Sequence, residues 1–127
     1  MYLRAALGHR FAAATLIQTN NFGVIRRFCH TQATADHAAL ACALEQYRLA
    51  HRQFPEKLEA LTPQFISTLP KDALTGESYK YRPTDDGRFV LYSVGWNEKD
   101  DGGTAAFNKD GEVILRNGDW VWEYPAP

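Results

Sequence analysis

At its most informative point the chain reads Leu91-Tyr92-Ser93-Val94-Gly95-Trp96-Asn97-Glu98-Lys99-Asp100-Asp101-Gly102-Gly103. Its first four residues are mostly aliphatic, aromatic or β-branched, a composition that favours a short strand. The nine residues that follow hold one Asn, one Glu, two Asp and three Gly. Ca²⁺ takes about six to eight oxygens from carboxylates, amides and backbone carbonyls, and glycine lets the backbone turn its carbonyls inward. Asp and Gly also gather in surface turns, so the loop alone is compatible with a turn or an ion site.

Strand-like runs and tight turns alternate on both sides of this loop. The runs cover residues 79–82, 88–94, 112–115 and 120–124, and turns with Asp-Gly or Asn-Gly stand at 85–87, 110–111 and 117–118. Because Asp-Gly is typical of hairpin connections, the first two runs predict an antiparallel hairpin. We expect the C-terminal half of the chain to form a sheet of three or four antiparallel strands.

The clearest helix precedes the strands, over residues 32–51. One of its faces carries residues at helical spacing, namely Leu40, Ala41, Leu44, Tyr47 and Arg48. A run of alanines favours a helix here, and Thr31 is a candidate cap. The helix is expected to end before Phe54-Pro55, because proline pushes the preceding residue out of the helical region.

Two shorter helices are predicted on either side of this one. Residues 1–30 show helical spacing until Asn20-Asn21-Phe22-Gly23 interrupts it, and 55–61 begins with proline in the first turn. Helices followed by strands indicate an α+β fold, with the long helix laid on one face of the sheet. We therefore expect an N-terminal helical segment or linker at 1–30 and one α+β domain at 31–127.

The composition and net charge of the chain limit the classes of partner that it is expected to have. The chain has 127 residues, is 45% hydrophobic and 13% aromatic, and carries a net charge of −1. This is a globular composition, and one adjacent basic pair, Arg26-Arg27, does not predict a nucleic-acid partner. No apolar run approaches the roughly 18 residues of a membrane span, and no export cleavage site follows residues 11–17. Membrane attachment is expected only through a segment outside this chain.

The two cysteines do not predict a bond or a metal site. Cys29 and Cys42 lie 13 positions apart, which is roughly 20 Å along a continuous helix and too far for a disulfide. Together with His30 and His37 they lack the paired spacing of structural zinc sites. The redox state of the two thiols is left open.

Three motifs follow one another in the second part of the chain. They are Leu44-Glu45-x-Tyr47-x₆-Phe54-Pro55-x₂-Leu58-x₂-Leu61-x-Pro63, then Leu69-Pro70-Lys71-Asp72-x₂-Thr75-Gly76-x₂-Tyr79-x-Tyr81, then Leu91-Tyr92-Ser93-Val94-Gly95 with Asp100-Asp101-Gly102-Gly103. In order and spacing, residues 33–124 resemble the C-terminal domain of the major pseudopilin of the type II secretion system. The run Gly118-Asp119-Trp120-Val121-Trp122 looks like pseudopilin-like C-terminal regions of larger bacterial membrane-anchored proteins.

The resemblance implies a pilin-like fold and a calcium site. In that family a long helix packs on an antiparallel sheet, and a loop after the second sheet strand holds Ca²⁺. The matching loop here is 94–103, with Glu98 and Lys99 facing solvent. The implied metal ligands are the side chains of Asn97, Asp100 and Asp101, the carbonyl of Val94 or Gly95, and Asp119, which would tie the loop to the last strand.

The resemblance also implies a function. It predicts a non-enzymatic, calcium-stabilised domain that mediates protein–protein contacts in a secretion or envelope assembly. Its partners would be other envelope or pseudopilin-type proteins, and its location the periplasm or cell envelope. The family opens with a processing site of Gly, Phe and a nearby Glu, whereas Gly8-His9-Arg10-Phe11 has no Glu after it. Filament assembly by this chain is therefore not expected.

Two alternatives come from other classes of protein. A hydrolase would use Asp100 or Asp101 as acid or base with His51, although Ser93 lacks a Gly-x-Ser-x-Gly elbow. Adjacent Asp side chains point apart on extended backbone, which argues against a carboxylate pair.

The second alternative is a small-ligand or carbohydrate-binding module. Trp120 and Trp122 share one strand face at i and i+2, and with Trp96 they could form a stacking platform. Large aromatic side chains are more often buried, so packing against the long helix is the competing interpretation.

Overall fold

A computed structural model describes residues 2–122 of the chain, with side chains from residue 22 onward. Its elements are the α-helix α1 (Tyr2–His51), the 3-10 helix η1 (Leu58–Leu61) and the strands β1 (Lys80–Pro83), β2 (Phe89–Ser93), β3 (Ala105–Phe107), β4 (Val113–Gly118) and β5 (Trp120–Trp122). One long N-terminal helix packs against small antiparallel sheets, so the predicted α+β class is confirmed.

α1 is one continuous helix of 50 residues. The predicted break at residues 20–23 is wrong, because an interior glycine such as Gly23 costs only about 1 kcal/mol and no proline precedes Pro55. The predicted start at Thr31 is wrong as well. The Thr31 hydroxyl donates a hydrogen bond to the Arg27 carbonyl, 2.9 Å away within the helix, instead of capping an end. α1 therefore crosses the boundary between residues 30 and 31 without interruption.

The predicted end of this helix is confirmed. α1 stops at His51, and the next residue, Arg52, has a φ of 65° in the left-handed region. Its N–H donates to the Arg48 carbonyl at 2.6 Å and so closes the last turn. The chain then reverses, and Phe54 enters the core.

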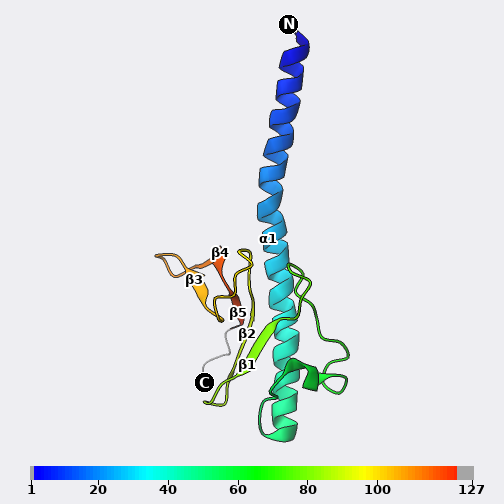
Figure 1. Cartoon of the computed structure of the whole chain (residues 1–127), viewed down its shortest axis with the longest axis vertical. Helices are drawn as coiled ribbons and strands as arrows, with labels where there is room; N and C mark the ends of the chain where they lie inside the picture. Colours follow the sequence, from blue (N-terminus) through cyan, green and yellow to red (C-terminus); the bar gives the residue numbers. More distant parts are fainter. Residues whose placement is uncertain (1, 123–127) are drawn as a thin grey trace.

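The strands form two sheets beside α1. β1, β2 and β5 make a three-stranded antiparallel sheet with β2 in the centre, and β3 and β4 make a two-stranded antiparallel ribbon. The predicted hairpin is confirmed, with Lys80 opposite Tyr92 and Pro83 opposite Phe89. Figure 1 shows that the sheet and η1 lie along the C-terminal half of α1, while the N-terminal half of the helix extends beyond them.

The hydrophobic core fills the space between α1 and the three-stranded sheet. Its buried members include Cys29, Ala33, Leu40 and Leu44 from α1, Leu58 and Leu61 from η1, and Phe89, Leu91 and Trp120 from the strands. The Phe54 ring meets the Phe89 ring edge-on, with centroids 5.1 Å apart. Because burying one such side chain contributes about 1.5–3 kcal/mol, this packing fixes the sheet on α1.

The segment between α1 and β1 differs from its prediction. The helix expected at 55–61 is a short 3-10 helix at Leu58–Leu61, because Lys57 before it has an extended backbone with φ of −142°. Leu58 and Leu61 of this short helix are buried against the core. Proline in the first turn was therefore not sufficient to start an α-helix.

The end of the chain also differs from its prediction. The Asn117-Gly118 pair is not a hairpin turn, since β4 runs through Gly118; the chain instead makes a corner at Gly118, whose φ is 71°, and only Asp119 separates β4 from β5. β3, at 105–107, was not predicted, and it pairs with β4. The last two residues of the strand predicted at 120–124 lie outside the described residues.

Two further findings concern α1. Between residues 2 and 122, no helix has the combination of length and apolar character that a membrane crossing needs. Cys29 and Cys42 are both free thiols, the first buried and the second exposed. Their separation along one unbroken helix accounts for the absence of a bond between them.

His37 is a buried ionisable residue at the interface of α1 with the sheet. It is 3% exposed, its ring meets the Tyr79 ring edge-on at 4.7 Å, and its Nε2 has no hydrogen-bond partner among the described residues. The charged or titratable groups around it are Asp36 and His30 on α1 and Asp72 on the connector to β1. Burial lowers the pKa of His37 from 6.5 to about 4, although Asp72 and Asp36 oppose this shift.

Acid should therefore destabilise the protein through His37. The folded state holds this histidine neutral, whereas the unfolded state takes up a proton near pH 6.5, so stability is complete above pH 6.5 and falls as the pH drops toward 4. We expect the free energy of unfolding in urea to decrease by about 2–3 kcal/mol between pH 7.5 and 4.5 on this account. His37→Leu should remove that part of the decrease. An equally steep pH dependence in this variant would contradict the assignment.

Candidate functional site

The loop of residues 94–104 leaves β2 and returns beside the corner between β4 and β5. It starts at Gly95, whose φ is 71°, and a Cβ placed there would lie 2.6 Å from the Gly118 carbonyl oxygen. Gly118 has the same φ, and a Cβ there would lie 2.7 Å from the Ala106 nitrogen. Only glycine allows both close approaches, so the loop and the corner are packed backbone against backbone.

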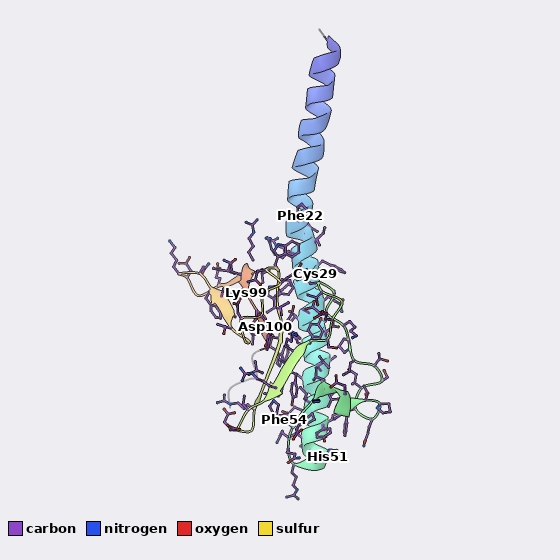
Figure 2. All side chains as sticks on the ribbon, in the orientation of Figure 1. Phe22, Cys29, His51, Phe54, Lys99 and Asp100 are labelled. Atoms are coloured by element: carbon purple, nitrogen blue, oxygen red, sulfur yellow. The ribbon has the colours of Figure 1, made fainter. Side chains whose placement is uncertain are left out.

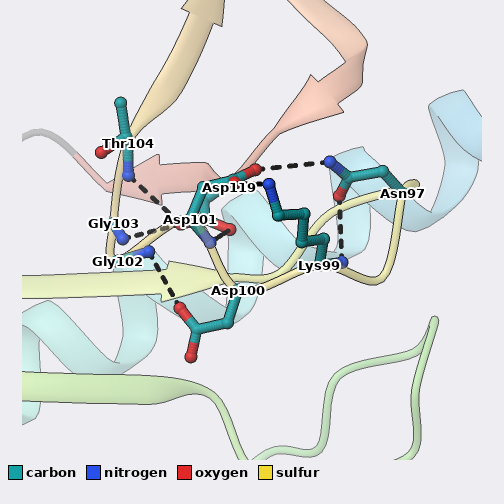
Figure 3. A network of polar contacts seen from close by, with 8 residues as sticks. All are labelled: Asn97, Lys99, Asp100, Asp101, Gly102, Gly103, Thr104 and Asp119. Atoms are coloured by element: carbon teal, nitrogen blue, oxygen red, sulfur yellow. Dashed lines mark hydrogen bonds and ion pairs between the residues drawn. The ribbon is translucent and has the colours of Figure 1, made fainter.

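Asp119, at this corner, connects the two segments. Its side chain is fully buried, at 0% exposure. One carboxylate oxygen accepts the N–H of Asp101 at 3.2 Å, and the other accepts the N–H of Gly103 at 2.6 Å and of Thr104 at 3.2 Å. Its own N–H donates to the Thr104 carbonyl at 2.9 Å. Figure 3 shows these N–H groups converging on one carboxylate, an arrangement that we call the Asp119 clamp.

The Asp119 clamp accounts for the shape of the loop. Hydrogen bonds to an ionised carboxylate are stronger than neutral ones, and a buried carboxylate needs such partners to offset its loss of hydration. The three N–H groups belong to a loop segment that has no strand partner of its own. The clamp thus supplies the hydrogen bonds that a sheet would otherwise provide, and it holds the loop against the end of β4.

Asp100 points away from the clamp. Figure 3 shows its carboxylate on the opposite side of the loop from Asp101 and Asp119. It accepts a hydrogen bond from the Gly102 N–H at 2.9 Å and another from the Tyr92 hydroxyl at 2.9 Å. These two bonds lower the pKa of Asp100, the Gly102 N–H having the larger effect. Burial, and then Asp100 itself, raises the pKa of Tyr92 to about 12.

Asp101 already has cationic and amide partners. The Lys99 ammonium lies 3.1 Å from one of its oxygens, and the Asn97 amide donates to the other at 3.4 Å. The Asn97 carbonyl oxygen accepts the Lys99 N–H at 3.2 Å. Lys99 is exposed, as predicted, but its ammonium group is directed at Asp101 in the same loop.

In this arrangement, the six predicted calcium ligands are not directed at one common point. The Asp119 oxygens face N–H donors, Asp100 is turned aside, Asp101 faces Lys99, and the Gly95 carbonyl accepts the Glu98 N–H at 3.1 Å. Among the described residues, no three His, Cys, Asp or Glu side chains gather where they could hold a metal. Val94, between the end of β2 and Gly95, is half-buried. Calcium binding stays a prediction, and the melting experiment below tests it.

The residues of the predicted hydrolase are not brought together. His51 lies at the C-terminal end of α1, and Figure 2 shows it far along the molecule from Asp100. Its Nδ1 is 3.0 Å from the Tyr47 carbonyl, and its ring stacks on the Tyr47 ring with centroids 4.1 Å apart. The contacts of His51 are thus those of a residue that closes a helix end.

The three tryptophans do not form an open platform. Trp120 is 3% exposed, meets the His30 ring edge-on at 5.1 Å, and donates its indole N–H to the Leu115 carbonyl at 3.2 Å. Trp96 is half-buried under the Arg26 guanidinium, 5.6 Å from its ring centroid. Trp122 is half-buried. The packing of Trp120 against α1 is the interpretation that the structure supports.

Sequence reasoning missed some residues of this site. Tyr92 and Lys99 orient the two adjacent carboxylates in opposite directions, and Thr104 contributes both an N–H and a carbonyl to the clamp. The available indication was the alternation of Asp100 and Asp101 on extended backbone, which sends neighbouring side chains to opposite faces. Thr104 takes part through its backbone N–H and carbonyl, so its residue type does not indicate this role.

Comparisons with known proteins do not assign the chain to a family. No family model matches it, and no curated protein matches it. The resemblance to pseudopilins is therefore not tested by these comparisons. Function has to be argued from the geometry of the chain itself.

Removal of the clamp should destabilise the fold. Asp119→Ala leaves three N–H groups without their acceptor, and we expect the free energy of unfolding to fall by about 2–4 kcal/mol. Asp119→Asn should cost less, because one amide oxygen remains as an acceptor. Asp110→Ala, at an exposed turn, is the matched control and should change stability by less than about 0.5 kcal/mol. Urea unfolding of the three variants measures these differences.

The same proteins test calcium. With the clamp formed by N–H donors, millimolar calcium should leave the melting temperature of the wild type unchanged, and so should a chelator. A rise of several degrees that chelator reverses, and that Asp119→Ala abolishes, would instead establish the calcium site.

The close approach at Gly118 should be sensitive to a single methyl group. Gly118→Ala and Gly111→Ala both place alanine at positive φ, 71° and 81°, but only the Cβ at 118 meets other atoms within 4 Å. We expect both variants to lose about 1 kcal/mol from the backbone conformation, and Gly118→Ala to lose a further 1–3 kcal/mol or so from overlap. Equal losses would show that the loop and the corner are not tightly packed.

Proposed function

We propose that this chain is a non-enzymatic, pseudopilin-like domain that contacts other proteins of a secretion or cell-envelope assembly through α1. The observation that carries the proposal is a group of large apolar side chains exposed on α1 where the helix leaves the sheet. The apolar band consists of Phe22 (58% exposed), Val24 (67%), Ile25 (48%) and Phe28 (67%).

The apolar band is unusual for a surface. Single exposed apolar residues are ordinary, but a group of large ones within about two helical turns is typical of a surface that another molecule covers. Burial of each such side chain by a partner would contribute about 1.5–3 kcal/mol. The band thus offers several kilocalories per mole to a protein that packs beside α1.

The domain also fixes the position of the band. Arg26, within it, lies over the Trp96 ring at 5.6 Å, and Cys29, one residue after it, is buried in the core. The band is therefore attached to the rigid part of the molecule, and a partner that binds it would be oriented relative to the sheet. Figure 2 shows Phe22 farther along α1 than Cys29, toward the part of the helix that emerges from the sheet.

Two features support the pseudopilin-like assignment within this proposal. A single N-terminal helix packs its C-terminal half on an antiparallel sheet and projects its N-terminal half away from it. The loop after the second strand is bonded to Asp119, which directly precedes the last strand and is the position for which the resemblance implied a metal ligand. We propose that the Asp119 carboxylate, and not a bound calcium ion, closes this loop.

Site-specific photo-crosslinking tests the proposal. A benzophenone amino acid at Phe28 should form covalent adducts with envelope proteins in the producing cells. The same probe at Phe107, an aromatic residue that is 51% exposed on β3, is the matched control and should form few adducts. Phe28→Glu combined with the probe at residue 24 should abolish the adducts, because a charge would have to be buried in the contact.

The proposal would fail on either of two results. One is the absence of adducts at residue 28 in a protein whose unfolding free energy is unchanged. The other is an identical set of adducts at residue 107, which would show that exposure alone accounts for the crosslinks.

A further inference from the structure

We propose that the protein surface that covers the apolar band carries a carboxylate, and that this carboxylate pairs with Arg27 at the edge of the band. The inference rests on the proposed function and names the chemistry of the partner. Residues 1–35 hold four arginines and no Asp or Glu, whereas residues 36–127 hold ten basic and fifteen acidic residues. The part of the chain that bears the band is therefore positive, and a negative surface complements it.

Arg27 has no charged partner of its own. It is exposed, and it forms no ion pair with any residue that the structure describes. The first acidic residue along the chain is Asp36, nine positions further on. Its two carboxylate oxygens already accept hydrogen bonds, from Gln32 at 2.9 Å and from the Tyr79 hydroxyl at 2.7 Å. The charge of Arg27 is thus available to another molecule.

Helical spacing places Arg27 beside two members of the band. Arg27 and Phe28 follow Val24 at the i+3 and i+4 positions, which are its neighbours on a helix surface. Val24 and Phe28 are each 67% exposed. A partner that covers these two side chains therefore comes within reach of the guanidinium. Because the apolar contact excludes water, it strengthens a charge pair at its edge, and one carboxylate can form two parallel hydrogen bonds with one guanidinium.

Arg26 adds a second positive charge to the band on another side of the helix. It is half-buried over the Trp96 ring, and its Nε has no hydrogen-bond partner among the residues that the structure describes. Successive residues are about 100° apart around a helix, so Arg26 is turned toward the sheet while Arg27 is turned away from it. Arg26 therefore raises the positive potential of the band, and Arg27 is the arginine that a partner on the open side meets.

A protein surface fits these observations better than an anionic membrane. Basic segments that bind membranes carry clusters of about four to eight Lys or Arg. The described part of the band offers Arg26, which is directed at Trp96, and Arg27. Past the band, α1 continues with the exposed polar side chains of Thr31 and Gln32. One free guanidinium beside a short apolar surface matches one carboxylate on a protein.

Two labelled peptides test the inference by fluorescence anisotropy with the full chain. Both are helical, with leucine on one face and alanine and glutamine elsewhere. They differ only at two positions beside the leucines, which hold glutamate in one peptide and lysine in the other. The wild type should bind the glutamate peptide at least about tenfold more tightly, the effect of one charge-assisted pair next to apolar surface. Arg27→Gln should remove this preference.

Charge reversal separates a pairing role from a structural one. Arg27→Glu should invert the preference, so that the lysine peptide binds more tightly, whereas damage to the fold would weaken both peptides alike. Arg116→Glu, at an exposed arginine on β4, is the matched control and should keep the preference of the wild type. Phe28→Ala should weaken both peptides and leave their ratio unchanged, because it removes apolar contact and no charge.

Several results would overturn the inference. These are the absence of binding by either peptide, equal binding of the two by the wild type, a preference that persists in Arg27→Gln, and the same inversion in Arg116→Glu. Binding to phosphatidylglycerol vesicles that Arg27→Glu abolishes would assign the charge to a membrane surface instead. Self-association in sedimentation velocity that this variant abolishes would assign it to a second copy of the chain.

The proposed function fails on a different result. Equal binding of the two peptides, with both weakened in Phe28→Ala, would leave the apolar band as a contact surface and remove only the carboxylate from its partner. The absence of adducts from the probe at residue 28 would remove the contact surface itself.

Discussion

The carboxylate of Asp119, buried and bonded to three backbone N–H groups, is the constraint on which the strand half of the molecule depends. Without it, the loop of residues 94–104 would have polar backbone and no sheet partner. With it, the loop is fixed to the corner between β4 and β5, and Gly95 and Gly118 can approach backbone to backbone. The β3–β4 ribbon, which Asp119 joins to β5, then keeps a set position relative to the three-stranded sheet.

The position of the sheet on α1 in turn divides the helix into two parts with different tasks. The C-terminal half buries Leu40 and Leu44 against the sheet, while the exposed side chains from Phe22 to Phe28 have no such cover from the described residues. His37 lies in the covered half, where burial favours its neutral form. The molecule thus presents an apolar helical surface at the end of its rigid part, and such a surface suits a contact with another protein.

Local patterns could be predicted from the sequence, and features that depend on three-dimensional packing could not. The β1–β2 hairpin and the end of α1 followed from Asp85-Asp86-Gly87 and Phe54-Pro55, whose effects act on neighbouring residues. The continuity of α1 through Gly23 was missed because that small cost is offset elsewhere. β3 was missed because a strand of three residues is too short to show an alternation of apolar and polar side chains. For the site, the proximity of Asp119 to the loop was anticipated, but the direction of each carboxylate depends on where backbone N–H groups point, which residue types do not reveal.

Amide hydrogen exchange, followed by NMR in the presence of a chelator, tests the central claim most directly. The account predicts that the N–H groups of Gly103 and Thr104, which lie in a loop but donate to Asp119, exchange at least about tenfold more slowly than that of Lys109, which is exposed in the turn between β3 and β4. Exchange as fast as that of Lys109, or protection that appears only after calcium is added, would contradict it.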